Sequence, residues 1–324
     1  MPYEALPDDV VHAVQSFHGA RWCNRSIPHL FRCSTCAQTD CGTWDCAHGV
    51  MPSYSLMWHE MVRPLAEALR AARTDAFPYL GSGDVYGFGM AHGHTVRMLY
   101  KALPNSRYFG FDSYHGLPAE DDHNSTMAVW RQGNFKPHRW ATPEYAEALG
   151  GGRRRAVVTP GFFDRTLTPK IVKAHNMSQA LYIDVDCDLH SSTSTVLAWL
   201  LSSRLLAVGT LVGFDDFWVI PCNHYRISKG KDVVNPLSVG EGKAHHEAVV
   251  QHGLRYVCVG GPCRPPPSTR HCHVHNHFAP IFLLVASGVP SGQEDNGFDF
   301  GSSAQMAEFM RSSRACASLR DMRR

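Results

Sequence analysis

The chain has 324 residues, of which 44% are hydrophobic and 19% are charged, and its formal net charge is +2. This length suits one large α/β domain with extensions, or two domains, and the apolar content excludes a disordered chain. A nearly neutral chain has no excess of basic residues to attract nucleic acids or membranes, so we expect neither as a partner.

The sequence also favours an intracellular setting. The first twenty residues contain acids but no apolar stretch behind a basic front, so no signal peptide is predicted. The longest late apolar run, residues 280–289, is too short to span a bilayer. Eleven cysteines are an odd number, and Cys187 and Cys222 lie beside predicted site elements, which favours a reduced compartment. We expect a cytoplasmic protein.

Residues 1–50 form a cysteine-rich N-terminal extension. Cys33 and Cys36 have a spacing compatible with tetrahedral zinc, and Cys41, Cys46 or His48 could complete four ligands. The second pair lacks the tight spacing of a zinc ribbon, so a loop of free or partly paired cysteines is the favoured interpretation. The zinc hypothesis is a structural Zn²⁺ at Cys33, Cys36, Cys41 and Cys46.

Residues 51–78 predict a helix that precedes the main domain. Apolar residues recur every three or four positions from Ser55 to Arg73, which is typical of an amphipathic helix. We expect this helix to pack across the following domain, residues 79–288, as a lid or brace.

A glycine-rich turn follows the first predicted strand, Asp84–Phe88. The turn spans Gly89–Gly93, and a helix begins near Thr95. Glycines between a strand and a helix let the backbone approach a ligand closely. The second predicted strand ends in Asp112, where an acid can accept hydrogen bonds from ribose hydroxyls. Together these features predict a site for a nucleoside-containing cofactor, although the spacing differs from the GxGxxG of dinucleotide enzymes.

A long connection follows Ser113 and contains one predicted helix, Pro143–Leu149, before the third strand, Ala156–Thr159. Later elements are a helix over Glu241–His252 and two strands, Leu254–Val259 and Pro280–Val285, which flank a histidine-rich hairpin. The tail, residues 289–324, contains one weak predicted helix, Ala304–Arg314.

The stretch Leu181–Thr195 is the most informative part of the chain. An apolar lead-in runs into three alternating acids, Asp184, Asp186 and Asp188, and a Ser/Thr cluster follows. This pattern predicts a buried strand that ends in carboxylates, then a turn, and then a helix capped by one of the hydroxyl residues.

Part of this pattern recurs in the apolar strand Thr210–Phe214, which is again followed by acids, Asp215 and Asp216. A strand, a helix and a second strand in one unit imply parallel neighbours, so both acid groups emerge at one edge of the sheet. Ligands bind at that edge in open α/β sheets, and clustered carboxylates repel one another unless a cation or a proton compensates. The sequence therefore predicts an α/β fold with parallel neighbouring strands and a divalent cation site at their carboxyl ends.

Four segments carry a resemblance to a known family. They are 109–118 (FGFDSYHGLP), 130–135 (WRQGNF), 183–193 (IDVDCDLHSST) and 209–216 (GTLVGFDD). Together they resemble the macrocin O-methyltransferase-like family of class I S-adenosylmethionine-dependent methyltransferases, several of which methylate sugar hydroxyls of natural products. The resemblance runs from about Asp84 to Val285 in the same order and spacing.

The resemblance implies a Rossmann-like α/β fold, with a doubly wound, mostly parallel seven-stranded sheet and helices on both faces, and it implies a set of site residues. Asp186, Asp215 and Asp216 would hold Mg²⁺, and Asp188 would be the general base. The cofactor-binding residues that we predict are Gly89, Gly93, Thr95, Asp112 and Ser113. This chain departs from the family pattern at three positions: Gly87 replaces an acid, Asp184 a histidine and His190 a tyrosine.

The residues fit this chemistry independently of the family. A neutral hydroxyl is a poor nucleophile, and a metal ion held by Asp186, Asp215 and Asp216 could lower its pKa and orient it. Asp188 would then take the proton. Oxygen ligands favour magnesium, or manganese or calcium, over zinc. The alternative is a purely structural role, in which these acids cap helices and accept hydrogen bonds that stabilise the fold.

The predicted function is therefore a metal-assisted S-adenosylmethionine-dependent O-methyltransferase acting on a hydroxylated small molecule, a sugar or another natural-product moiety. Its oligomeric state stays open. One alternative is a nicotinamide-dependent oxidoreductase, which would share the sheet and Asp112 but would not need the paired acids. A second is a non-catalytic methyltransferase-like scaffold with a zinc-binding N-terminal module.

Overall fold

The computed structural model describes residues 2–23, 54–119, 130–221, 224, 228, 231, 233–260 and 280–298, and for residues 16–23 and 54–60 it describes the backbone alone. The proposed zinc ligands Cys33, Cys36, Cys41 and Cys46 lie outside the described residues, as do the histidine-rich hairpin and the predicted helix of the tail.

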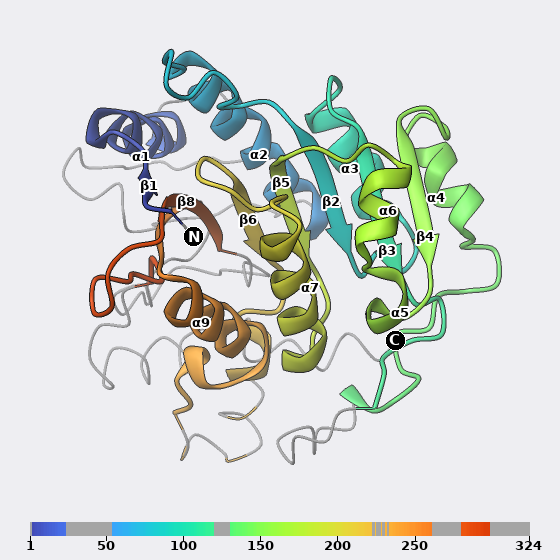
Figure 1. The fold of residues 1–324 in the computed structure, drawn as a ribbon. Helices are drawn as coiled ribbons and strands as arrows, with labels where there is room; N and C mark the ends of the chain where they lie inside the picture. Colours follow the sequence, from blue (N-terminus) through green and yellow to red (C-terminus); the bar gives the residue numbers. More distant parts are fainter. Residues whose placement is uncertain are drawn as a thin grey trace.

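The described residues form one mixed sheet of eight strands in the order β1-β8-β6-β5-β2-β3-β4, with β7 paired to the other edge of β8 (Figure 1). Five strands are mutually parallel, whereas β8 runs antiparallel to β6 and β7. The strands are β1 Glu4–Ala5, β2 Asp84–Phe88, β3 Tyr108–Asp112, β4 Ala156–Pro160, β5 Ala180–Val185, β6 Leu211–Phe214, β7 Leu254–Gly260 and β8 Ile281–Ser287.

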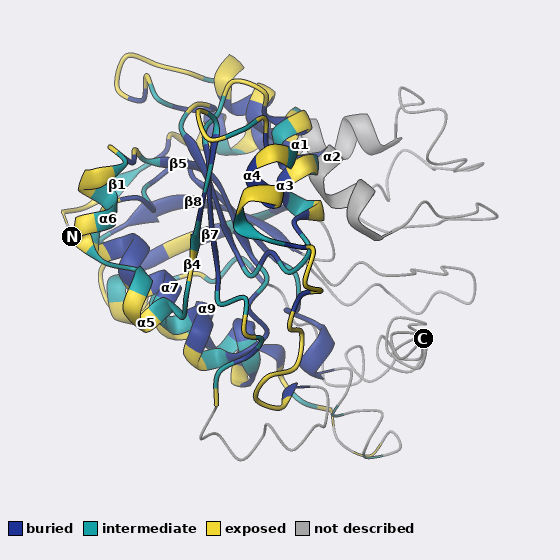
Figure 2. Cartoon of the chain, turned by 90° about the vertical axis from the view of Figure 1, so that its right-hand side faces the viewer, coloured by how far each residue is buried: buried dark blue, intermediate teal, exposed yellow. Residues whose placement is uncertain are grey.

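Helices cover both faces of this sheet, as the edge-on view in Figure 2 shows. One face carries α1 Asp8–Cys23, α2 Tyr54–Ala71, α3 His94–Ala102 and α4 Pro143–Leu149, and the other carries α5 Phe163–Thr166, α6 Pro169–Ala174, α7 His190–Ser202 and α9 Gly240–His252. Because both faces are covered, the central strands β2, β3, β5 and β6 are buried along their whole length, which explains their nearly continuous apolar sequences. The predicted α/β doubly wound architecture is confirmed, but the predicted number of strands is wrong: the sheet of the described residues has eight strands and not seven, because β1 of the N-terminal extension pairs with β8.

Each face has its own apolar core. On the face of α7, Trp199 packs edge-on against Phe88 and Phe111, with ring centroids 6.2 Å and 5.5 Å away. On the opposite face, Leu65 and Leu69 of α2 belong to a second buried cluster. These two layers hold the sheet rigid, so the strand ends have fixed positions.

The helix predicted over Ser55–Arg73 lies at Tyr54–Ala71 as α2 and packs beside α1 and α3. Arg63 of α2 donates a 3.0 Å hydrogen bond from Nε to the carbonyl oxygen of Ala102 at the end of α3. The N-terminal extension contributes an element that the sequence pattern did not indicate, because β1 adds to the edge of β8. None of the helices among the described residues combines the length and apolar character of a membrane span.

The direction in which successive strands are added across the sheet reverses between the parallel strands β2 and β5. From β2 the chain adds β3 and β4 on one side, and it then returns to add β5 and β6 on the other. In open α/β sheets this switch point leaves a crevice at the carboxyl ends of the strands, where ligands bind. The strands therefore place any ligand site beyond Phe88, Asp112, Val185 and Phe214.

Candidate active site

A cavity of about 530 Å³ lies beyond these strand ends. Residues that follow five strands line it: Gly89 after β2, Asp112 and Ser113 at β3, Phe162 after β4, Asp186 and Asp188 after β5, and Asp215 and Asp216 after β6. Apolar side chains of the long connection, among them Leu117, Trp130 and Phe135, also line it. One cavity is thus lined both by residues predicted to bind a nucleoside and by residues predicted to bind a cation.

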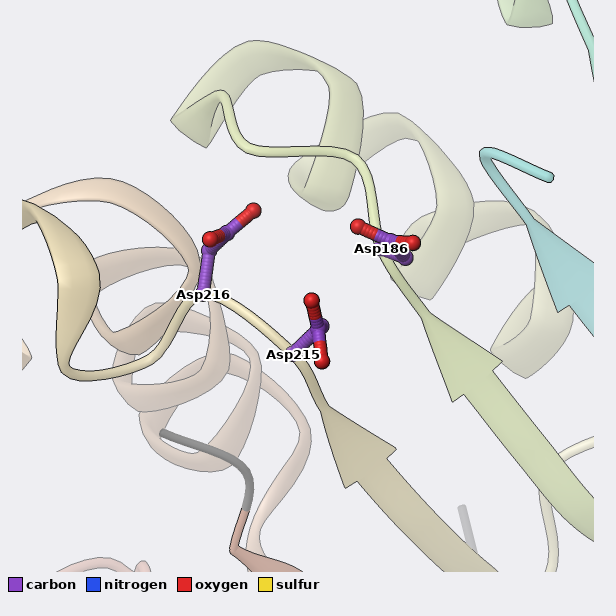
Figure 3. Close-up of side chains that lie close together, drawn as sticks. All are labelled: Asp186, Asp215 and Asp216. Atoms are coloured by element: carbon purple, nitrogen blue, oxygen red, sulfur yellow. The ribbon is translucent and has the colours of Figure 1, made fainter. Parts of the chain in front are cut away.

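Asp186, Asp215 and Asp216 converge in this cavity (Figure 3). One carboxylate oxygen from each lies within 4.8 Å of the others. The backbone explains the convergence: the Asp186 amide donates to Phe88 of β2 and the Asp215 amide donates to Val185 of β5, both at 2.9 Å. Parallel pairing therefore brings the two aspartate loops side by side, as predicted.

These carboxylates are unfavourable neighbours without a compensating positive charge. Burial, followed by the charges of Asp215 and Asp188, raises the pKa of Asp186 well above its usual range. Burial and the charge of Asp188 do the same to the pKa of Asp216. Three oxygen donors that close, in a partly buried position, fit a hard divalent cation such as Mg²⁺.

Asp188 lies beside this group and is held by a tryptophan. Trp130 Nε1 donates a 2.7 Å hydrogen bond to Asp188 Oδ1, and both residues line the cavity. Burial raises the pKa of Asp188, against the lowering effect of hydrogen bonds with Asp216 and Trp130. Asp188 has a left-handed backbone, with φ of 61°, which is uncommon for a residue other than glycine and is often found at functional sites.

The turn at Asp188 also changes the start of α7. The helix begins at His190 after Leu189, with no side-chain cap, so the prediction that a hydroxyl residue caps it is wrong. The reason is that the left-handed residue reverses the chain early and places the Ser/Thr cluster inside the first two turns. Ser191 and Ser192 consequently line the cavity.

Asp184 is the first of the three alternating acids in the chain, and unlike Asp186 and Asp188 it does not line the cavity. It is buried, and its Oδ1 accepts a 3.0 Å hydrogen bond from the Tyr182 hydroxyl. Burial and then the charge of Asp215 raise the pKa of Asp184 to about 7. Asp184 is paired with Gly87 of β2 in the parallel ladder, so the acid lies next to the position where the family pattern has one.

The space beside Gly87 is occupied by Tyr108. A β-carbon on Gly87 would lie 1.9 Å from the Tyr108 hydroxyl oxygen, well inside a van der Waals contact. Tyr108 is buried, and its hydroxyl has no hydrogen-bond partner among the described residues. Tyr108 therefore occupies the space that any side chain at position 87 would need.

The glycine turn packs directly on the loop that contains Asp186. Gly89 has φ of 80°, and a β-carbon there would lie 1.7 Å from the carbonyl oxygen of Asp186. Asp112 holds the turn, because its Oδ2 accepts hydrogen bonds of 2.8 Å from the amides of Met90 and Ala91. Asp112 and Gly89 still line the cavity, where a nucleoside would bind them.

The other predicted cofactor residues are placed differently. Ser113 lines the cavity, but its hydroxyl donates a 2.7 Å hydrogen bond to Gly116 within its own turn. Gly93 has φ of 77° and precedes α3, and Thr95 lies in the first turn of that helix. Neither is among the cavity-lining residues of the described chain, and their roles toward a cofactor stay predictions.

Sequence reasoning missed the role of Glu241. Its side chain is fully buried, and it accepts backbone hydrogen bonds from Cys187 at 3.2 Å and from Asp216 at 2.9 Å. An available signal was the glycine on each side of it, Gly240 and Gly242, because an acid between two glycines at a helix start marks a close approach of backbone segments.

No protein-family model and no curated protein matches the chain. Among solved structures, it is similar to the calicheamicin methyltransferase CalS11, with 16% sequence identity over 87% of this chain and 94% of that chain and a TM-score of 0.47. It is also similar to the O-methyltransferase NovP, with 15% identity over 86% of this chain and 98% of that chain and a TM-score of 0.47. The Podospora anserina methyltransferase PaMTH1 shows 13% identity over 74% and 90% of the two chains, with a TM-score of 0.34. At these values the similarities assign no activity to this chain.

Proposed function

We propose that this chain is an S-adenosylmethionine-dependent O-methyltransferase that uses a divalent cation and methylates a hydroxyl of a small molecule, a sugar or another natural-product moiety. One observation carries the proposal: a single cavity joins the glycine turn and Asp112 to the aspartates Asp186, Asp215 and Asp216. A nicotinamide oxidoreductase has no need of three converging carboxylates, whereas a hydroxyl nucleophile benefits directly from a cation.

The residues divide into two groups along the cavity. Gly89 and Asp112 would contact the nucleoside, because the turn exposes backbone and the carboxylate can accept from ribose hydroxyls. Asp186, Asp215 and Asp216 would hold Mg²⁺, since their oxygens lie close enough to bind one ion together. The acceptor would lie between the two groups, against Trp130, Leu117 and Phe135.

When bound, S-adenosylmethionine supplies an electrophilic methyl group and Mg²⁺ supplies a positive charge that lowers the pKa of a nearby hydroxyl. Asp188 would accept the proton that the acceptor hydroxyl loses when it is methylated. Trp130 fixes the Asp188 carboxylate through its indole N–H, so the base is oriented before the acceptor arrives.

The proposal is tested first by binding. Isothermal titration of the full chain with S-adenosylhomocysteine and, separately, with NADH should show affinity for the former alone. Methyl transfer from labelled S-adenosylmethionine to a panel of hydroxylated metabolites, with and without Mg²⁺, should then identify an acceptor and a metal requirement.

Two results would replace this proposal with another. Binding of NADH without S-adenosylhomocysteine would indicate the oxidoreductase. About one equivalent of zinc in the purified chain, combined with no affinity for either nucleotide, would indicate the non-catalytic scaffold.

A further inference from the structure

The ends of β5 and β6 continue their hydrogen-bonding pattern by one residue. The Asp186 amide donates to Phe88 and the Asp215 amide donates to Val185, so the first residue after each strand is still held by its neighbour in the sheet. Beyond these two residues the strands diverge into separate loops. The next amide in each loop, of Cys187 and of Asp216, needs another acceptor.

Glu241 provides that acceptor to both loops. Its Oε1 accepts from the Cys187 amide at 3.2 Å, and its Oε2 accepts from the Asp216 amide at 2.9 Å. The Glu241 side chain is fully buried, so water does not compete for these contacts. A single carboxylate therefore joins the two loops that carry the candidate cation ligands, at the point where the sheet no longer does so.

The start of α9 is shaped for this contact. Gly240 has φ of 50°, and a β-carbon on it would lie 2.4 Å from Ile220 Cδ1. A β-carbon on Gly242 would lie 2.2 Å from the carbonyl oxygen of Pro236. Gly240 lets the first turn of α9 approach Ile220 and the carbonyl oxygen of Asp188, and Gly242 lets the same turn pack on Pro236 just before the helix. A carboxylate in that turn is favoured by the positive end of the helix dipole.

We infer that Glu241 is a positioning residue for the cation site, and this inference rests on the proposed function. It sets the separation of Asp186 from Asp216, because it holds the amide of Cys187, the residue after Asp186, and the amide of Asp216 itself. Both Glu241 oxygens accept backbone N–H groups, so Glu241 acts through the ligands and is not counted among them. A cation site needs its donors held within a fraction of an ångström, and loops alone rarely achieve this.

The test compares Glu241→Gln with Glu147→Gln in the full chain. The Glu241 amide variant keeps one acceptor oxygen and turns an NH₂ group toward the second backbone N–H. Glu147 is the matched control, because it is also buried and accepts a backbone hydrogen bond, from Val158 at 3.2 Å, but it lies in α4 and does not line the cavity. Mn²⁺ affinity is measured by electron paramagnetic resonance, S-adenosylhomocysteine affinity by calorimetry, and amide exchange by mass spectrometry.

In Glu241→Gln we expect the Kd for Mn²⁺ to rise about tenfold or more, with the Kd for S-adenosylhomocysteine within about twofold of wild type. Amide exchange should become faster in the peptides that contain Cys187 and Asp216. Glu147→Gln should lose stability without any change in Mn²⁺ affinity. If Glu241→Gln does not fold, Glu241→Asp keeps the charge but shortens the reach, and the same increase in the Kd for Mn²⁺ is expected.

Three outcomes would overturn the inference. A folded Glu241 variant with wild-type Mn²⁺ affinity overturns it and leaves the proposed function intact. An equal loss of Mn²⁺ and S-adenosylhomocysteine affinity also overturns it, because that result indicates general damage. A wild-type chain that binds S-adenosylhomocysteine but not Mn²⁺ removes the cation from the proposed function, and the inference falls with it.

Discussion

Trp130 and Asp188 are 58 positions apart in the sequence, and the indole Nε1 of the first donates a 2.7 Å hydrogen bond to Oδ1 of the second. Trp130 belongs to the long connection after β3, whereas Asp188 follows β5. The contact therefore ties the wall of the cavity to its candidate base. It also explains how a residue in a strained left-handed turn keeps one orientation.

Replacing Asp188 by Asn should abolish turnover and leave cofactor affinity nearly unchanged. The amide cannot accept the hydroxyl proton, and general base action is typically worth about a hundredfold to ten-thousandfold in rate. Single-turnover methyl transfer and titration with S-adenosylhomocysteine measure the two effects. Asp164→Asn is the matched control, since Asp164 also lines the cavity but its side chain is 71% exposed. A near-wild-type rate in Asp188→Asn would remove Asp188 as the base.

Replacing Trp130 by Phe should move the acid limb of the pH–rate profile to higher pH. Burial raises the pKa of Asp188, and the hydrogen bond from Trp130 opposes that rise, so its loss lets the pKa rise further. Because the deprotonated form is the active one, more alkaline conditions are then needed. Loss of a hydrogen bond worth about 1.4 kcal/mol also predicts that kcat/KM falls about tenfold at pH values below the acid limb. An unchanged profile would show that the indole N–H does not act on the base.

Replacing Asp215 by Asn should stabilise the metal-free protein and remove its response to Mg²⁺. The charge of Asp215 raises the pKa of both Asp184 and Asp186, which shows that the three carboxylates repel one another. Removing this repulsion is worth on the order of 1 kcal/mol, or about 2 °C in Tm. Thermal unfolding with and without Mg²⁺ measures both effects. A lower Tm for the metal-free variant would contradict the repulsion argument.

Replacing Gly89 by Ala should weaken Mg²⁺ and S-adenosylhomocysteine binding together. The new β-carbon would lie 1.7 Å from the Asp186 carbonyl oxygen, so the turn and the aspartate loop must separate. Gly152→Ala is the control, because Gly152 has a similar φ of 85° but has nothing within 4 Å of the added carbon. For Gly89→Ala alone, we expect the dissociation constants for Mg²⁺ and for S-adenosylhomocysteine each to rise at least about tenfold. Equal effects of the two substitutions would attribute the loss to backbone strain.

Stability should fall between pH 6.5 and pH 4 because of His245. Burial is the main cause that lowers the pKa of His245 to about 4, although its Nε2 lies 2.9 Å from the Asn296 carbonyl oxygen. In this window the unfolded chain binds a proton that the folded chain does not, so stability decreases as pH falls and levels off below pH 4. The contribution is up to about 3 kcal/mol.

Urea unfolding at several pH values measures this contribution. His245→Gln should flatten the slope between pH 6.5 and pH 4, whereas the exposed His115→Gln should keep the wild-type slope. The hypothesis fails if the slope of His245→Gln equals that of the wild type.

The strands and the convergence of the aspartates were predictable because both depend on short-range patterns. Buried parallel strands have continuous apolar sequences, and parallel pairing fixes which ends meet, so Asp186, Asp215 and Asp216 could be placed together before the structure. The helix Pro143–Leu149 was likewise predicted with its observed ends, since Thr142 caps it and proline starts it.

The contacts that orient the site were not predictable because they join distant segments. The glycines beside Glu241 indicate a close backbone approach, but they do not identify the amides of Cys187 and Asp216 as the groups that its oxygens bind. Nothing in the sequence near Trp130 identifies Asp188 as its partner. The start of α7 was misplaced for a related reason: a left-handed aspartate is rare, so a Ser/Thr cap was the better expectation.

The Tyr108 hydroxyl beside Gly87 has a consequence for how this chain can change. An acid does not fit at position 87 while Tyr108 keeps its place, because the two side chains would occupy the same volume. A smaller residue at position 108 alone would leave an empty space in the buried sheet face. The two positions are therefore coupled: an acid at position 87 needs a smaller residue at position 108, and a smaller residue at position 108 needs a side chain at position 87 to fill the space.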